Sequence, residues 1–196
     1  MDRLVAKLYK IFETKYQIAE IMTVITIGGL PGTGTTTIAN LLTTKIQIPY
    51  IYTGDIFRTL AKQYNMSLEE FSTYAENHPE VDNELDEQQL EILIKGEIIL
   101  EGRLAGWIAH HNNIPATKIM LLANLKVRAQ RIVKREGGDI KKRSDEIRIR
   151  EQSENRRYKN YYNIDVSDLS IYDIVIDTSE LSPEMILQKI LDSMKK

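Results

Sequence analysis

Short apolar segments alternate with longer segments of helical periodicity through most of the chain. Each apolar segment is rich in β-branched or aromatic residues and has the length of a buried strand, and they lie at 24–27, 49–52, 98–100, 118–123 and 174–176. Between them, apolar residues recur every three or four positions, as on the buried face of a helix. This alternation predicts an α/β fold, a parallel five-stranded sheet with helices on both faces.

Residues 1–21 stand apart from this pattern. Their apolar residues fall on one helical face with lysines between them, which favours a short amphipathic helix that either packs against the rest of the chain or frays; these residues are Leu4, Val5, Leu8, Ile11 and Phe12. They contain no continuous apolar core of the kind found in a secretory signal. We therefore interpret residues 1–21 as an N-terminal extension and residues 22–196 as one domain.

A glycine-rich loop joins the first predicted strand to the following helix, within the sequence T-V-I-T-I-G-G-L-P-G-T-G-T-T-T at 23–37. Strand, loop and helix in this order form the frame of a P-loop, G-x-x-x-x-G-K-[ST]. Glycines let backbone N–H groups approach phosphate oxygens, and the helix N-terminus adds partial positive charge. A plain glycine-rich turn is the alternative. We predict that phosphates bind at Gly29, Leu30, Pro31, Gly32, Thr33, Gly34, Thr35, Thr36 and Thr37.

Two positions near this loop bear on charge and metal binding. Thr35 stands where a P-loop normally has lysine, so another cation must supply positive charge to the β- and γ-phosphates. Thr36 fits the hydroxyl that ligates Mg²⁺. The third predicted strand leads into Glu101, and ligands of open α/β sheets bind at the carboxyl ends of strands. We therefore predict a Mg²⁺ site formed by Thr36 and Glu101.

Two helical regions have compositions that suggest substrate binding. An acidic region before the third strand includes a capping-box signature at Ser67–Glu70 and a helix over 81–95, and it has the size of a mobile substrate-binding insertion. After the fourth strand, two arginine-rich helices flank Gly137 and Gly138. Arginine donates bidentately to phosphate, so we predict a lid over about 136–160, with a solvated charged surface as the alternative.

The overall composition narrows the class of partner. Lysine and arginine number 26 against 28 aspartates and glutamates, a net charge of −2, so no basic field indicates nucleic-acid binding. The chain has no cysteine, which excludes disulfides and favours a cytoplasmic setting. No apolar run approaches the roughly 20 residues that span a bilayer. We expect a cytoplasmic monomer that binds small nucleotides, without nucleic-acid or membrane partners.

Several motifs, in order along the chain, resemble the archaeal type of cytidylate kinase, a family of P-loop nucleoside monophosphate kinases. The resemblance covers residues 22–195 and is carried by T-G-D-I-F-R at 53–58, M-S-L-E-E-F at 66–71, E-G-R-L-A-G at 101–106 and I-R-I-R-E-Q-S-E-N-R-R-Y at 147–158. Members of this family commonly have G-T-T-T where other kinases have G-K-[ST]. Thr35 is therefore consistent with the family pattern.

The resemblance implies phosphorylation of CMP, and also of dCMP, by ATP with Mg²⁺. Arg58 and Arg103 match arginines that bind the CMP phosphate, and a trio on the lid helix matches residues near the transferred phosphoryl group. We accordingly expect catalytic roles for Arg150 and Arg157, and we also expect one for Arg131 of the arginine-rich helix before Gly137. Expected substrate contacts come from Asp55, Arg58, Arg103, Arg150, Glu154 and Arg157. Bacterial relatives carry a base-recognising aspartate where this chain has Leu104.

Two other functions remain open at this point. The first is a related kinase whose acceptor is AMP or UMP, since none of the motifs above fixes the base. The second is a regulator that binds nucleotides but lost catalysis together with the P-loop lysine. Assays with different acceptor nucleotides separate these alternatives.

Overall fold

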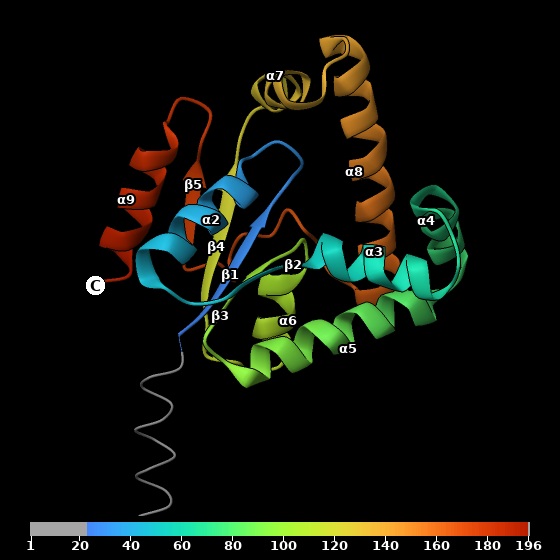
Figure 1. Cartoon of the computed structure of the whole chain (residues 1–196), viewed down its shortest axis with the longest axis horizontal. Coiled ribbons are helices and arrows are strands. Elements are labelled where there is room, and N and C mark those ends of the chain that lie inside the picture. The colour runs from blue at the N-terminus through green and yellow to red at the C-terminus, as the bar shows by residue number, and fades with distance from the viewer. Residues whose placement is uncertain (1–22, 196) are drawn as a thin grey trace, which may run out of the picture.

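The strands form one parallel sheet. The computed structural model describes residues 23–195, so the predicted extension at 1–21 lies outside the described residues. The sheet has the order β2-β3-β1-β4-β5, and every neighbouring pair is parallel (Figure 1). This confirms the predicted fold class. The strands are β1 (Val24–Gly29), β2 (Tyr50–Tyr52), β3 (Ile98–Glu101), β4 (Thr117–Leu122) and β5 (Ile174–Asp177).

Helices follow the strands in the expected alternation. They are α2 (Thr35–Ile46), α3 (Thr53–Gln63), α4 (Leu68–Asn77), α5 (Pro79–Lys95), α6 (Ala105–His111), α7 (Leu125–Glu136), α8 (Ile140–Tyr162) and α9 (Pro183–Ser193). The sequence pattern did not predict α6. This helix is short and buried along most of its length, so it lacks the polar face that gives helical periodicity. Within residues 23–195, no helix is long and apolar enough to cross a membrane.

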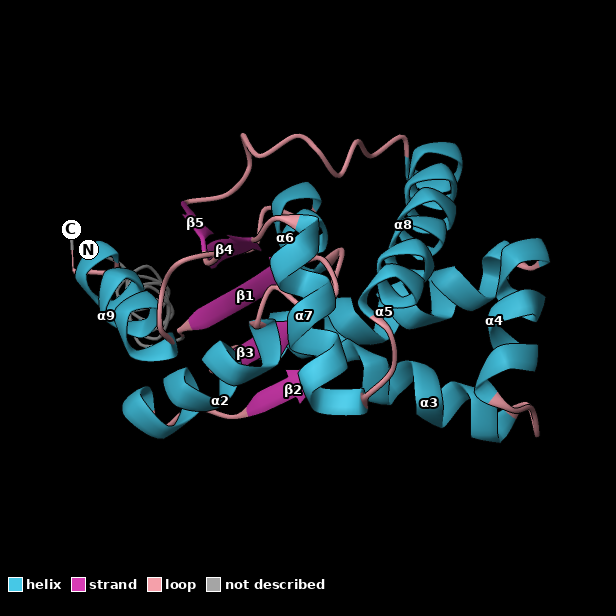
Figure 2. Cartoon of the chain, turned by 90° about the horizontal axis from the view of Figure 1, so that it is seen from above, coloured by secondary structure: helices cyan, strands magenta, loops and turns pink. Residues whose placement is uncertain are grey.

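Helices cover both faces of the sheet, as predicted. On one face, Ile25 and Ile27 of β1 pack in a core with residues of α2 and α9. On the other face, the core joins Leu100 of β3 to Leu93 of α5 and Trp107 of α6. Figure 2 shows α2 and α9 on one side of the strands and α5 and α6 on the other. Because neighbouring strand residues point to opposite faces, the nearly continuous apolar strands are explained by these two cores.

The helical region between β2 and β3 has a small core of its own, formed by Leu60, Ala61, Phe71, Ala75 and Val81. The predicted capping box at Ser67 and Glu70 is present at the start of α4. Helix α8 lies against this region, because the Tyr161 hydroxyl donates to the Glu76 carbonyl oxygen at 3.0 Å. The α3–α5 region and α8 therefore face each other beside the sheet (Figure 1).

The start of α3 lies beside the end of β3. Helix α3 begins at Thr53, directly after β2, and Asp55 lies in its first turn. Thr53 Oγ1 donates to the Glu101 carbonyl oxygen at 3.0 Å. This contact ties the first turn of α3 to the end of β3.

Candidate active site

The glycine-rich loop lies between β1 and α2, at the carboxyl end of the sheet. Gly34 precedes α2 with φ +97°, a left-handed conformation that favours glycine. A Cβ atom at Gly29 would lie 2.9 Å from the Leu121 carbonyl oxygen and would also meet Thr33 Oγ1. Glycine is therefore required at both positions, and the loop has the backbone form that a phosphate-binding P-loop needs.

Thr36 and Glu101 meet at the predicted metal position. Thr36 Oγ1 donates to Glu101 Oε1 at 2.8 Å, and the Tyr50 hydroxyl donates to Glu101 Oε2. Glu101 is only 4% exposed, and within residues 23–195 it forms no ion pair with lysine or arginine. Burial and the adjacent Glu101 carboxylate raise the pKa of the Tyr50 hydroxyl, so Tyr50 remains a neutral donor that orients Glu101.

These residues fit Mg²⁺. The ion prefers oxygen ligands and usually binds through one or two carboxylates together with substrate phosphates. A hydroxyl and a buried carboxylate without a cationic partner provide such oxygens beside the phosphate loop. In the described part of the chain, no cluster of three or more His, Cys, Asp or Glu could hold a metal by itself. The site therefore suits an ion that arrives with nucleotide phosphates.

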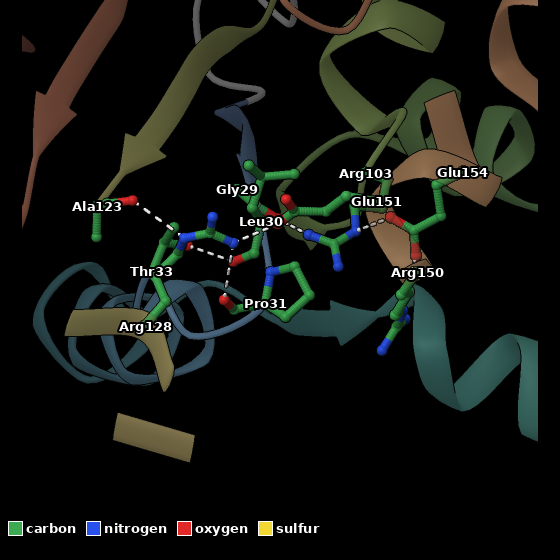
Figure 3. A network of polar contacts seen from close by, with 10 residues as sticks. All are labelled: Gly29, Leu30, Pro31, Thr33, Arg103, Ala123, Arg128, Arg150, Glu151 and Glu154. Carbon is green, nitrogen blue, oxygen red and sulfur yellow. Dashed lines mark hydrogen bonds and ion pairs between the residues drawn. The ribbon is translucent and has the colours of Figure 1, made fainter. Parts of the chain in front are cut away.

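Three arginines lie around the loop, namely Arg103, Arg128 and Arg131. Arg103 Nη1 donates to the Gly29 carbonyl oxygen, as expected for a residue just after β3. Arg128 Nη1 donates to Pro31 O at 3.5 Å and also pairs with Glu151 of α8. Figure 3 shows Gly29, Leu30 and Pro31 between Arg103 and Arg128. Arg103, two residues after the end of β3, therefore contacts the start of the loop.

Arg131 donates hydrogen bonds to backbone carbonyl oxygens of the loop. Its Nη1 donates to Gly32 O and Thr33 O, both at 3.3 Å, and to Thr178 Oγ1 at 2.9 Å. Its Nη2 donates to Thr178 O at 2.6 Å. The guanidinium thus connects the loop to the segment after β5. This geometry indicates a positioning role, and the catalytic role expected for Arg131 stays a prediction.

Glu154 links α8 to the phosphate loop through Arg103. Its Oε2 pairs with Arg103 Nε at 3.0 Å, and its Oε1 pairs with Arg150 Nε at 2.8 Å (Figure 3). The Arg150 side chain is 62% exposed, whereas Glu154 and Arg103 are mostly buried. Glu154, Arg150 and Arg103, all expected from the sequence to contact substrate, therefore form one cluster, in which a single carboxylate pairs with two arginines.

The other expected substrate residues are Asp55, Arg58 and Arg157, and each of them forms an ion pair. Arg58 pairs with Asp55 at 2.8 Å within α3, and its guanidinium lies over the Tyr52 ring at the end of β2. Arg157 turns away from the phosphate loop, and its Nε lies 3.2 Å from Asp82 Oδ2 of α5. Arg157 therefore does not join Arg150 and Glu154 in this structure.

Sequence reasoning missed two parts of the site. Tyr50 orients Glu101, but a tyrosine in a short strand gives no signal of that role in the sequence. Asp82 and Asp86 face a cavity between α5 and α8, although we treated their helix only as an acidic region. Their spacing of four residues places both side chains on one helical face, which was the available signal.

The fold and the phosphate loop define a P-loop kinase. Similar solved structures include a shikimate kinase from Bacteroides thetaiotaomicron, with TM-score 0.62 and 15% identity over 89% of this chain and 99% of that one. A gluconokinase from Sinorhizobium meliloti has the same TM-score, with 10% identity over 88% of this chain and 91% of that one. At these identities the likeness concerns the fold alone.

The chain belongs to the cytidylate kinase-like family, whose model matches residues 24–180. A cytidylate kinase from Methanocaldococcus jannaschii is 50% identical over 177 residues, which cover 88% of this chain and 99% of the relative. One from Pyrococcus horikoshii is 47% identical over 161 residues, or 82% of each chain. The family resemblance seen in the sequence is thus confirmed.

Proposed function

We propose that the protein transfers the γ-phosphoryl group of ATP to CMP, and also to dCMP, with Mg²⁺. The observation that carries this proposal is the cluster of Thr36, Glu101, Arg103 and Glu154 at the glycine-rich loop, in a chain of the cytidylate kinase-like family. The cluster combines a phosphate-binding backbone, oxygen ligands for Mg²⁺ and arginine donors. Phosphoryl transfer requires these groups for positioning and charge stabilisation.

The chemistry needs no general base from the protein. A phosphate oxygen of CMP, already anionic at neutral pH, attacks the γ-phosphorus while the bond to the β,γ-bridging oxygen breaks and ADP leaves. Backbone N–H groups of the loop hold the donor phosphates. Arg103 and Arg58 hold the acceptor phosphate, and Arg150 from the lid at 136–160 reaches the transferring group. Thr36 and Glu101 would hold Mg²⁺, which would neutralise negative charge on the donor phosphates.

The same observations bear on the two alternative functions that the sequence left open. An intact loop, metal position and arginine cluster favour an enzyme over a regulator without catalysis. Relatives named as cytidylate kinases favour CMP over AMP or UMP as acceptor. A cytoplasmic location and a monomeric state stay predictions.

ADP release from ATP and Mg²⁺ in the presence of CMP tests the proposal, with Arg58→Ala as the informative variant. We expect the wild-type protein to form ADP and CDP in equal amounts. Arg58→Ala should raise KM for CMP about tenfold and leave KM for ATP nearly unchanged, because it loses one charge-assisted contact worth roughly 1.5 kcal/mol. Absence of CDP with the wild type would refute the proposed function. Unchanged CMP kinetics in the variant would refute the role of Arg58.

A further inference from the structure

A cavity between α5 and α8 adjoins the cluster at the phosphate loop. Asp82, Asp86 and Gln89 line it from α5, and Arg157 and Tyr162 line it from α8. Arg103, which we assign to the acceptor phosphate, lines the same cavity. A nucleotide whose phosphate lies at Arg103 would therefore extend its sugar and base toward the polar face of α5.

Buried acceptor atoms without hydrogen-bond partners face this cavity. Asp82 and Gln89 are each 3% exposed, and neither Asp82 Oδ2 nor Gln89 Oε1 accepts a hydrogen bond from any described residue. Asp82 has Arg157 Nε nearby at 3.2 Å, but the atoms are not aligned for a hydrogen bond. Buried polar atoms are usually paired, and an unpaired one destabilises the folded protein. These oxygens therefore indicate a ligand that brings N–H donors.

Asp86 adds a second carboxylate one helical turn from Asp82. Its Oδ1 accepts from Gln89 Nε2 at 3.1 Å, and the Tyr162 hydroxyl also hydrogen-bonds to it. Burial raises the pKa of Asp86 to about 6, although the Tyr162 hydroxyl and the more distant Arg157 charge act in the opposite direction. Burial also raises the pKa of Asp82 despite Arg157. Burial thus disfavours the charged form of both carboxylates in the protein without a ligand.

We propose that Asp82, Asp86 and Gln89 recognise the exocyclic amino group of the acceptor base and so distinguish cytosine from uracil. This inference rests on the proposed function and adds its base specificity. Cytosine presents an N4 amino group with two N–H donors, whereas uracil presents the O4 acceptor at the same place. The carboxylate and amide oxygens of α5 attract the amino group and repel O4. Arg157 provides the complementary donor for the acceptor atoms of the ring.

The position of these groups also explains why the chain can have Leu104 where bacterial relatives have a base-recognising aspartate. This residue lines the same cavity but offers no hydrogen bond, so α5 supplies the carboxylates for the base. The cavity has a volume of about 60 Å³, and within it Arg157 Nε lies 3.2 Å from Asp82 Oδ2. The amino group of a bound base would compete with Arg157 for the Asp82 carboxylate.

Asp86→Asn tests the inference through the ratio of kcat/KM for CMP to kcat/KM for UMP. The amide offers a donor to O4 in place of a repelling carboxylate oxygen, so activity with UMP should rise relative to CMP. We expect the ratio to fall roughly tenfold or more, and Asp82→Asn should act in the same direction. Glu91→Gln, at an exposed position of the same helix, is the matched control and should leave the ratio unchanged.

The ratio separates recognition from a structural role. It does not depend on the concentration of folded enzyme, so partial unfolding of a variant leaves it unaltered. Equal losses with CMP and UMP, at an unchanged ratio in both variants, would overturn the inference while leaving the proposed function standing. A wild-type protein that fails to phosphorylate CMP would instead overturn the proposed function itself.

Discussion

Replacing Arg150 with alanine is expected to lower kcat about 10³-fold while changing the binding of ATP and CMP much less. The Arg150 side chain is 62% exposed, and its Nε pairs with Glu154, whose other carboxylate oxygen pairs with Arg103 beside the phosphate loop. From there it can approach the transferring phosphoryl group, where negative charge is spread over three oxygens. Arginines in this position contribute about 10³–10⁵ to the rate of other phosphoryl-transfer enzymes. An interaction formed mainly in the transition state lowers kcat when it is lost.

Arg148→Ala provides the matched control for this prediction. Arg148 lies on the same helix, is 60% exposed and pairs with Asp145 within α8, as Arg150 pairs with Glu154. Single-turnover kinetics with saturating ATP and CMP should therefore separate the two variants. Equal small effects of both changes would show that Arg150 belongs to a solvated charged surface and plays no part in catalysis.

Thr36→Ala is expected to lower kcat/KM by roughly 10–100-fold and to raise the Mg²⁺ concentration needed for half-maximal rate. The hydroxyl lies 2.8 Å from Glu101 Oε1, so its loss removes one oxygen ligand of the proposed metal site. Loss of groups around a metal typically costs this much in affinity or activity. High Mg²⁺ should restore part of the rate, since the carboxylate and the nucleotide phosphates remain.

Thr35→Ala separates the metal site from general damage to the loop. Thr35 is the neighbouring residue in α2 but makes no contact with Glu101 among the described hydrogen bonds. Its replacement should change the rate modestly and leave the Mg²⁺ dependence as in the wild type. A rate profile measured against Mg²⁺ concentration decides the matter. If Thr36→Ala leaves that profile unshifted, Thr36 is not a metal ligand.

The fold and the phosphate loop were predictable because they depend on local rules. Buried strands and amphipathic helices have distinct periodicities. The glycines between 29 and 34 predict a tight loop, in which a side chain at Gly29 would collide with its neighbours. Glu101 and Arg103 were placed correctly because parallel strands bring their carboxyl ends to one edge of the sheet. These inferences need only the order of elements along the chain.

The directions of individual arginines could not be predicted in the same way. Arg150 and Arg157 are two turns apart on α8, yet Arg150 pairs with Glu154 of the same helix and Arg157 pairs with Asp82 of α5. That difference depends on which carboxylate lies within reach of each guanidinium in the folded protein, and the α8 sequence alone does not specify that carboxylate. Helix α6 was missed for another reason, since a short buried helix shows no polar face.

The measurement that tests the central claim most directly is the set of kcat/KM values for CMP, dCMP, UMP and AMP, obtained with ATP and Mg²⁺ by ADP release. We expect CMP and dCMP to be the best acceptors, with UMP and AMP lower by at least about tenfold, because their donor pattern or size does not match the cavity between α5 and α8. Preference for UMP or AMP, or ADP release that is independent of any acceptor, would contradict the account.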